Sequence, residues 1–279
     1  MILIVGSKGM FGCDLLSMLG GRARGLGRDD IDITSPVSVQ RVLSTLKPAM
    51  VINCAAYTDV DGCETNCETA TQVNADGVVN LATVTRDIGA RLVQISSDYV
   101  FDGGKGAPYL EDDRTGPLSV YGQSKLAGER AAAINPDHLI VRTQWLYGIH
   151  GKNFVETMLR MGAEKDLLTV VDDQIGSPTW TVDLCRAIIA LNNRGCRGIY
   201  HAANAGFCSW NGFARAIFEE AGLPVCVHSM TTAELNRPAR RPLYSTLDCS
   251  KLERDSGFKP QPWRDALRAY LQLRRSGQA

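Results

Sequence analysis

A tyrosine and a lysine four residues apart, Tyr121 and Lys125, form a pair suited to proton transfer. Residues at positions i and i+4 lie on one face of a helix, so the phenol and the ammonium group would be neighbours. A free phenol has a pKa near ~10, and an adjacent positive charge favours the phenolate and brings proton transfer within range of neutral pH. Tyrosine and lysine are common at this spacing on helices, so assigning a function needs a second element.

Hydroxyl side chains at the end of a predicted strand supply that second element. The segment Gln94-Ile-Ser-Ser97-Asp98 ends an apolar run that begins at Arg91. In a doubly wound sheet, the carboxyl ends of the strands face the cofactor crevice. Ser97 at such an end can hydrogen-bond a substrate carbonyl while Tyr121 delivers the proton, which predicts chemistry on a carbonyl group.

A glycine-rich turn near the start of the chain predicts a dinucleotide site. The turn follows the apolar run Met1–Val5 and opens a helical pattern. Glycines let the backbone approach a pyrophosphate, and a helix N-terminus supplies N–H groups and a positive dipole. The spacing is G-x-x-G-x-x-G rather than G-x-G-x-x-G, and a turn that only packs helix on strand is the alternative. The residues of this turn predicted to bind the cofactor are Gly6, Lys8, Gly9, Met10, Phe11 and Gly12.

The end of the second predicted strand indicates which dinucleotide binds. Enzymes that prefer NAD usually place an acid there for the ribose 2′-hydroxyl. Here the first charge after the strand is Arg28, whose guanidinium suits a 2′-phosphate, so NADPH is favoured. NADH stays possible because Asp29 and Asp30 adjoin this arginine, and a solvated surface arginine is the alternative. The residues expected beside the adenine, or under the ribose and phosphates, are Asp32, Ile33, Cys54, Ala55, Ala56 and Tyr57.

Alternating strand and helix patterns in the first 150 residues predict the fold. One helical pattern starts at Ser35-Pro36, and another covers residues 64–89 and includes Gly77. Repeated strand–helix–strand units predict an α/β protein with a doubly wound parallel (Rossmann) sheet and right-handed crossovers. Continuous apolar runs suit strands that are buried on both faces. These runs are Met1–Val5, Arg22–Leu26, Ala49–Cys54, Arg91–Ile95 and His138–Val141.

After about residue 150 the pattern changes and predicts a smaller C-terminal substrate-binding lobe. Helix Thr181–Asn192 and strand Gly198–His201 are expected to return to the main sheet. The Rossmann domain is therefore predicted to comprise residues 1–149 plus about 176–202, and the lobe about 150–175 and 203–279. A helix that starts at Ser209 carries aromatic residues at helical spacing, which are expected to be core. They are Trp210, Phe213 and Phe218.

Three arginines gather in a loop-rich stretch of the predicted lobe. Arg237, Arg240 and Arg241 fit a solvated face and a diphosphate site about equally well. Arg241 is the best candidate for a ligand contact because Pro242 follows it and restricts its backbone.

Composition and charge limit the class of protein. The 279 residues are 44% hydrophobic, and 30 Lys+Arg balance 30 Asp+Glu, which disfavours a general nucleic-acid binder. No apolar run approaches the ~20 residues of a membrane-spanning helix, and the chain opens in an apolar strand rather than a secretory leader. The nine scattered cysteines suit reduced thiols. A cytoplasmic enzyme with no nucleic-acid or membrane partner is expected.

Several motifs resemble the extended short-chain dehydrogenase/reductases and, within them, the dTDP-4-dehydrorhamnose reductases. The resemblance covers nearly the whole chain, and the Asp-Gln-x-Gly-x-Pro-Thr segment is its most specific motif. The tyrosine and lysine motif alone would fit any sugar-nucleotide epimerase or dehydratase. The matching segments are Ser96–Gly103, Pro117–Glu129, Val141–Gly148, Asn153-Phe154, Asp173–Thr179 and Arg241-Pro242.

The resemblance implies an NADPH-dependent reduction of the C4 ketone of dTDP-4-dehydro-β-L-rhamnose to dTDP-L-rhamnose. Hydride would come from the nicotinamide and the proton from Tyr121. Lys125 would orient the ribose and lower the pKa of the phenol, and Ser97, where the family usually has threonine, would polarise the ketone. Asn74 would lie near the cofactor crevice, while Tyr57 stands where some relatives have histidine. The residues implied on the substrate side are Ser97, Asp98, Val100, Phe101, Tyr121, Trp145, Asn153 and Arg241.

Two alternatives and two open properties accompany this interpretation. The first alternative is another nucleotide-sugar epimerase or dehydratase with NAD(P), although the acidic pair typical of dehydratases is absent because Tyr99 follows Asp98. The second is a non-catalytic NADP-binding regulatory subunit. Some relatives dimerise through Mg²⁺, but only Asp14 of such a ligand set can be matched, so no metal is predicted. A monomer or a homodimer is expected.

Overall fold

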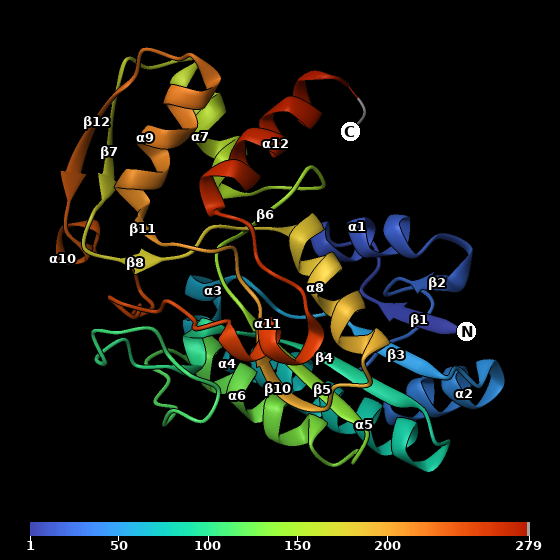
Figure 1. The fold of residues 1–279 in the computed structure, drawn as a ribbon. Helices are drawn as coiled ribbons and strands as arrows, with labels where there is room; N and C mark the ends of the chain where they lie inside the picture. The colour runs from blue at the N-terminus through green and yellow to red at the C-terminus, as the bar shows by residue number, and fades with distance from the viewer. Residues whose placement is uncertain (278–279) are drawn as a thin grey trace.

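A six-stranded sheet in the order β10-β5-β4-β3-β1-β2 forms the centre of the structure, a computed structural model that describes residues 1–277 (Figure 1). Every neighbouring pair of its strands is parallel. The chain places β2 on one side of β1 and β3 on the other, so a topological switch point lies between β1 and β3. The predicted doubly wound sheet is confirmed. Its strands are β1 (Ile2–Val5), β2 (Ala23–Leu26), β3 (Met50–Asn53), β4 (Arg91–Ser97), β5 (His138–Thr143) and β10 (Gly198–His201).

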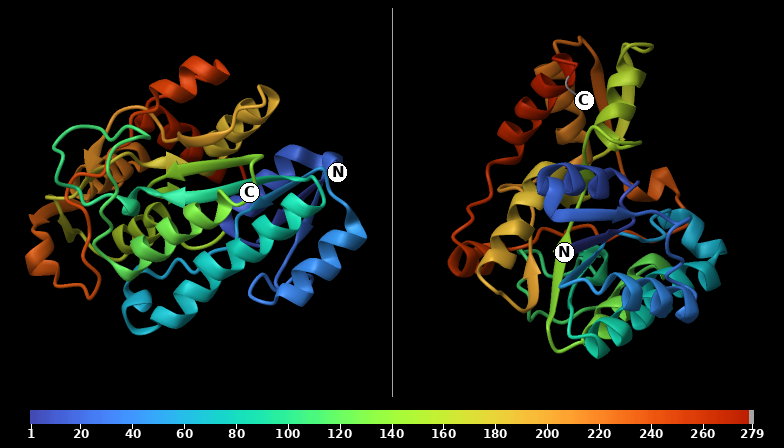
Figure 2. Two further views of the ribbon diagram at one scale, coloured as in Figure 1. Left: turned by 90° about the horizontal axis from the view of Figure 1, so that it is seen from below. Right: turned by 90° about the vertical axis from the view of Figure 1, so that its right-hand side faces the viewer.

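Helices cover both faces of this sheet (Figure 2). Successive side chains of a strand point to opposite faces, so Leu3 of β1 enters one apolar cluster and Ile4 the other, both fully buried. Burial on both faces explains why the strands are continuous apolar runs. On one face lie α2 (Pro36–Leu46), α5 (Gly77–Asp87) and α6 (Val120–Ala132), and on the other α1 (Met10–Leu19), α8 (Thr181–Asn193) and α11 (Ser250–Ser256).

The segment predicted as one helical pattern over 64–89 is divided into several pieces. Helices α3 (Val60–Thr65) and α4 (Cys67–Thr71) precede a π-helical turn at Gln72–Asp76, and α5 follows directly. Gly77 therefore begins α5 rather than breaking it. A Cβ atom at this glycine would lie 2.8 Å from the side chain of Ile33, so glycine allows α5 to approach the loop before α2 closely.

The second part of the structure is a smaller lobe beyond the carboxyl ends of the sheet strands (Figure 1). Its core contains the fully buried Phe213 and Tyr270. Three short two-stranded pairs shape it: β6 (Leu146–Tyr147) with β9 (Thr179–Trp180), β7 (Leu167–Val171) with β12 (Cys226–Met230), and β8 (Ile175–Gly176) with β11 (Cys208–Ser209). Its helices are α7 (Phe154–Gly162), α9 (Trp210–Ala221), α10 (Thr232–Leu235) and α12 (Trp263–Arg275).

Helix α11 departs from the predicted lobe boundary. Strand β10 joins the main sheet beside β5, as predicted, but α11 also packs on the sheet side, against α8 and β10. Its Leu252 is fully buried in the same apolar cluster as Ile4 and Leu184. Residues 250–256 therefore lie with the Rossmann domain, because Leu252 finds its apolar surroundings there.

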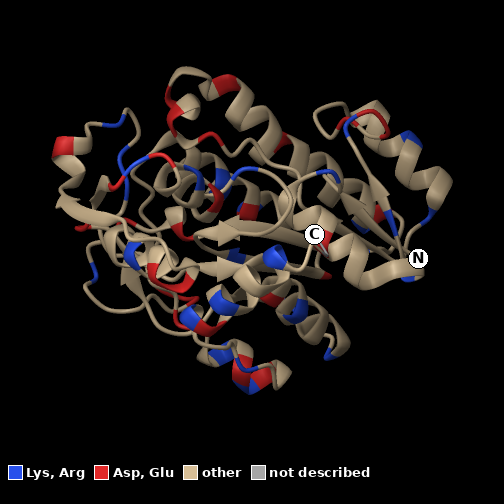
Figure 3. Ribbon diagram, turned by 90° about the horizontal axis from the view of Figure 1, so that it is seen from above, with Lys and Arg blue, Asp and Glu red and all other residues tan. Residues whose placement is uncertain are grey.

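Charged residues of both signs are spread over the helices and loops (Figure 3). Among residues 1–277, no helix combines the length and the apolar character that crossing a membrane would require. All nine cysteines are free thiols.

Candidate active site

The glycine-rich turn leads directly into α1 at the switch point of the sheet. Gly6 has a φ of +79°, and a Cβ atom there would lie 2.6 Å from the amide nitrogen of Ala55. A Cβ at Gly12 would lie 2.4 Å from the carbonyl oxygen of Gly6. Within the described residues 1–277, no side chain caps α1, and no acid occupies its first turn. Close backbone approach and uncapped N–H groups at Met10 and Phe11 fit a pyrophosphate.

Cations and acids alternate around the end of β2. Arg28 is exposed there, and the Lys8 ammonium lies 2.9 Å from the exposed carboxylate of Asp29. Asp30 accepts a hydrogen bond from the amide of Gly27 at 2.7 Å, so this acid stabilises the turn itself. Both cations are thus placed where the adenosine ribose of a dinucleotide is expected.

Asp32 and Ile33 serve the entry to α2 in this structure. The Asp32 carboxylate accepts hydrogen bonds from the amide of Thr34 at 3.0 Å and from its hydroxyl at 2.7 Å. The side chain of Ile33 is buried against the sheet cluster. A contact with adenine stays a prediction for the exposed Asp32.

Buried amides shape the segment Cys54–Tyr57 at the end of β3. Asn53 donates to Gln94 of β4 at 2.8 Å and accepts from the amide of Ala55 at 3.1 Å. Asn74, in the π-helical turn, accepts from the amide of Tyr57 at 2.8 Å and donates to the Ser124 hydroxyl at 3.0 Å. Asn74 therefore joins the predicted cofactor segment to α6.

Sequence reasoning missed Asn53 and Gln94, although both interrupt otherwise apolar strands. An amide at such a position requires a buried partner, because burying an unpaired polar group is unfavourable. This requirement was the signal available in the sequence.

Tyr121 lies in the first turn of α6, which begins where the Ser119 hydroxyl accepts from the amide of Gly122 at 3.2 Å. Its ring packs edge-on against Tyr99, with centroids 5.3 Å apart. Burial raises the pKa of the Tyr121 phenol well above its usual value, and the Ser97 hydroxyl, which faces the phenol, opposes this rise. The phenol is therefore protonated at neutral pH, as a proton donor must be.

Lys125 is buried one turn further along α6, and its Nζ donates to the carbonyl of Ile95 in β4 at 2.7 Å. Burial lowers the pKa of Lys125 to about 8, against the opposing effects of the Glu129 carboxylate and Cys54. Burial dominates the pKa of the Tyr121 phenol, and Lys125 is not among the groups that lower it, unlike the expectation from the sequence. The ammonium group is engaged by the strand rather than by the tyrosine.

A hydrogen-bonded chain links the strand-end hydroxyl to the smaller lobe. Ser97 donates to Asp98 at 2.9 Å, and Ser245 donates to the second oxygen of the same carboxylate at 2.6 Å. Burial raises the pKa of Asp98 to about 6, although both hydroxyl donors favour its ionised form. This chain fixes the position of the Ser97 hydroxyl beside Tyr121.

A buried ion pair lies beneath these groups. Arg142 of β5 donates to both oxygens of Glu129 of α6 at 2.8 Å, and the Ser96 hydroxyl donates to the same carboxylate at 2.5 Å. His201 lies beside Arg142 and is fully buried, and burial and the arginine charge lower its pKa to about 3. The pair ties α6, and with it Lys125, to the sheet.

Val100 and Phe101 differ from the expected substrate contacts. Both side chains are fully buried, and Phe101 stacks on Tyr109 with centroids 4.1 Å apart. Their side chains are therefore covered by the protein itself, and a substrate contact stays a prediction.

Arg241 contacts α3 across the space between the lobes. Its guanidinium donates to both carboxylate oxygens of Asp61, at 3.1 and 3.0 Å, and the exposed Arg237 pairs with the same carboxylate at 3.2 Å. Burial acts to raise the pKa of Asp61, but the donors from Arg241 and the amide of Ala239 outweigh it and lower the pKa. Of the three clustered arginines, Arg241 is the one held near Tyr99, which packs edge-on against Tyr121.

Trp145 and Asn153 lie at the junction of the two lobes. Trp145 follows β5 and stacks on Trp210, which was expected to be core but is only partly buried. Asn153 caps α7 by accepting from the amide of Glu156 at 3.1 Å, and it donates to the carbonyl of Gly148 at 2.7 Å. The Asn153 side chain is therefore fully engaged within the protein, and a substrate contact stays a prediction.

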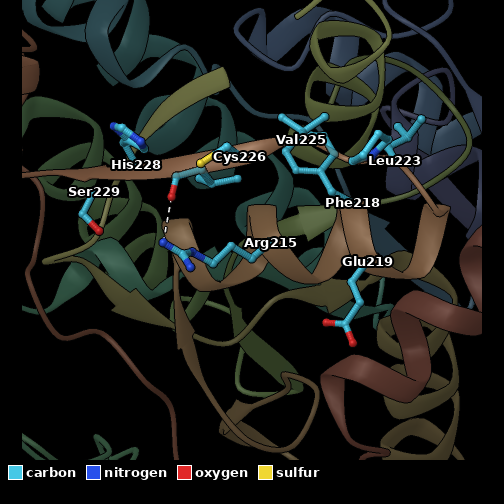
Figure 4. Close-up of a pocket in the computed structure, with 10 residues that line it drawn as sticks. Arg215, Phe218, Glu219, Leu223, Val225, Cys226, His228 and Ser229 are labelled. Atoms are coloured by element: carbon cyan, nitrogen blue, oxygen red, sulfur yellow. Dashed lines mark hydrogen bonds between the residues drawn. The ribbon is translucent and has the colours of Figure 1, made fainter. Parts of the chain in front are cut away.

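Asp14 and a hollow in the smaller lobe are two further features. Asp14 bonds to Thr181 and approaches His150 at 3.5 Å, and within residues 1–277 no group of three or more His, Cys, Asp or Glu gathers as a metal site. A hollow of about 610 Å³ between α9 and β12 includes none of the predicted site residues (Figure 4). Arg215 spans it and donates to the carbonyl of Val227 at 2.7 Å.

Comparison with known protein families identifies the family of this chain. The model of the RmlD substrate binding domain matches residues 1–275. The chain belongs to the dTDP-4-dehydrorhamnose reductase family. A relative of that name from Streptomyces griseus is 45% identical over 277 residues, covering 95% of this chain and 91% of the relative.

Solved structures of the family agree with the fold. A dTDP-4-dehydrorhamnose reductase from Clostridium acetobutylicum superposes with a TM-score of 0.96 at 43% identity, covering 98% of this chain and 99% of that one. The dTDP-4-dehydrorhamnose reductase from Bacillus anthracis, solved in complex with NADP, superposes with a TM-score of 0.94 at 39% identity, covering 97% and 98%. The expected oxidoreductase class is therefore confirmed.

Proposed function

We propose that this protein reduces the C4 ketone of dTDP-4-dehydro-β-L-rhamnose to dTDP-L-rhamnose with NADPH. The observation that carries the proposal is the meeting of a protonated, buried phenol, Tyr121, with the strand-end hydroxyl of Ser97, one helical turn from Lys125. Proton donor and carbonyl-polarising hydroxyl thus lie together at the carboxyl edge of the sheet.

The residues around the glycine-rich turn fit a dinucleotide. The backbone at Gly6 and Gly12 leaves no room for a Cβ atom, and the N-terminus of α1 is free of acids. When bound, NADPH supplies the hydride that reduces the carbonyl carbon. Arg28 and Lys8 would hold the 2′-phosphate, and the NADP complex of the Bacillus anthracis relative supports this choice.

The chain's own groups handle the proton and the ketone. Ser97 shifts its hydrogen bond from Asp98 to the ketone oxygen and polarises the carbonyl. As charge develops on that oxygen, Tyr121 donates its phenolic proton, so that the ketone gains one hydride and one proton and becomes a secondary alcohol. Lys125, positively charged below its pKa of about 8, stabilises the phenolate until solvent returns the proton.

Charge on the other side of the site suits a nucleoside diphosphate. Arg241 is held near Tyr99 by Asp61, and an incoming diphosphate would share its guanidinium. Trp145 would pack against the deoxysugar. The nine free thiols further support a reducing compartment such as the cytoplasm.

The test follows NADPH absorbance while enzymatically prepared dTDP-4-dehydro-L-rhamnose is supplied. Tyr121→Phe should lower kcat by about 10²–10⁴-fold, because it removes the proton donor and little else. The matched control is Tyr200→Phe, whose hydroxyl bonds to Asp255 away from the site at 2.9 Å and should leave kcat unchanged. An active Tyr121→Phe would refute the assigned donor, and an inactive parent protein that still binds NADPH would refute the substrate.

A further inference from the structure

Trp145 has a backbone conformation that is unusual for a bulky residue. Trp145 has a φ of +48°, in the left-handed region, and only two other non-glycine residues among those described share this sign. A bulky residue rarely adopts this conformation without support from its surroundings. The contacts of the indole must therefore account for its placement.

Two residues of the smaller lobe define that placement. The ring of Trp210 lies face to face with the ring of Trp145, with centroids 3.6 Å apart and planes inclined by 9°. Gly176 of β8 borders the same indole so closely that a Cβ atom would lie 2.5 Å from its Cε2 atom. Because β8 pairs with β11 just before Trp210, both contacts come from one short two-stranded unit.

Trp210 itself is held firmly. Its Nε1 donates to the side-chain oxygen of Gln174 at 3.2 Å, and the buried Gln174 donates in turn to Thr232 at 2.9 Å. The ring of Phe154 in α7 also packs against the ring of Trp210, with centroids 4.6 Å apart. Trp210 is thus fixed by three segments of the smaller lobe, whereas Trp145 belongs to the strand end of the Rossmann domain.

We propose that Trp210 is a positioning residue that orients Trp145 toward the sugar. The proposal rests on the proposed function, in which the indole of Trp145 contacts the deoxysugar. The flat face of Trp210 and the small Gly176 keep one indole orientation populated before substrate arrives. Since Trp210 contacts Trp145, Phe154 and Gln174 rather than the residues proposed to hold the cofactor, loss of Trp210 should affect the sugar and spare the cofactor.

The main test replaces Trp210 by Leu, which keeps an apolar side chain but removes the flat face. The KM for dTDP-4-dehydro-L-rhamnose should rise roughly tenfold, the effect expected from losing one aromatic stack, while the KM for NADPH stays unchanged. Trp210→Phe should restore most of the affinity. Trp263→Leu, in the same lobe and away from Trp145, is the matched control and should leave both KM values unchanged.

A double-mutant cycle separates positioning from general stability. If Trp210 acts through Trp145, Trp210→Leu should add no further increase in KM once Trp145 has been changed to Ala. Additive effects would overturn the proposal, as would an unchanged KM in a folded Trp210→Leu protein.

A second variant changes Gly176, the other residue that contacts the indole of Trp145. Gly176→Ala introduces a Cβ into the space of the indole and should also raise the KM for the sugar nucleotide, which keeps the proposal testable if Trp210→Leu does not fold. A parent protein that fails to reduce the sugar nucleotide would count against the proposed function, whereas an active parent with insensitive variants would count against Trp210 alone.

Discussion

Gly128 in α6 offers a sharp test of how the catalytic helix is packed. A Cβ atom at Gly128 would lie 2.2 Å from the backbone oxygen of Asn74, in the π-helical turn, whereas real Cβ atoms essentially never come closer than 3.0 Å. Gly128→Ala must therefore displace one of two backbones by about 0.8 Å. No rotamer change relieves the contact, because the backbone fixes the position of the Cβ atom and its neighbour is a main-chain oxygen.

The expected magnitude combines two opposing effects. Alanine is favoured over glycine inside a helix by about 1 kcal/mol, whereas overpacking a well-packed core costs about 1–3 kcal/mol. With a contact this short, the upper end of the packing cost applies, and Gly128→Ala should lower the free energy of unfolding by about 2 kcal/mol. Since Gly128 lies between Lys125 and Glu129, kcat should fall as well.

Urea unfolding gives the free energy, and Gly212→Ala in α9 is the matched control. A Cβ at Gly212 would meet its nearest neighbour, the Ser209 hydroxyl, at an ordinary 3.4 Å. The control should gain up to about 1 kcal/mol from helix propensity alone. A Gly128→Ala protein that gains stability as the control does would refute the close packing of α6 on the π-helical turn.

Three further results are expected. Lys125 loses its charge above a pKa of about 8, so kcat/KM should fall as pH rises through about 8, and a profile that stays flat to about pH 10 would argue against a role for the ammonium group. The pKa of Asp98 in the folded protein, about 6, exceeds its usual 3.8, so protonation of Asp98 stabilises the fold fully below about pH 4 and this contribution is lost as pH rises through about 6. Asp98→Asn should weaken the pH dependence of the free energy of unfolding in urea. An equal pH dependence in the parent protein and the variant would contradict this reasoning. Arg142→Met should cost about 3–5 kcal/mol by leaving Glu129 buried and unpaired, and adding Glu129→Leu should restore most of it; no recovery in the double variant would argue against the ion pair.

The sequence predicts most of the sheet, because strands that are buried on both faces consist of continuous runs of apolar residues. Gly198–His201, for example, is observed at its predicted bounds. The pairing of Tyr121 with Ser97 was also predictable, since helix spacing and strand ends alone bring these residues to one edge.

Features that depend on distant partners were not predictable. The π-helical turn before Gly77 forms where Asn74 meets α6, and helix periodicity carries no record of that contact. Trp210 has the spacing of a core residue, yet it stacks on a tryptophan that lies 65 positions earlier in the chain. Likewise, nothing local to Leu252 shows that its apolar partners lie under the first strand.

The return of α11 to the sheet has a consequence for biosynthesis. The cluster that includes Ile4 is completed only when β10 and then Leu252 arrive, near the end of the chain. Domains usually fold in order as they leave the ribosome. Here the amino-terminal nucleotide-binding half must wait, with one face of its sheet partly uncovered, until almost the whole polypeptide has been synthesised. Truncation before residue 250 should therefore impair the part of the protein that was made first.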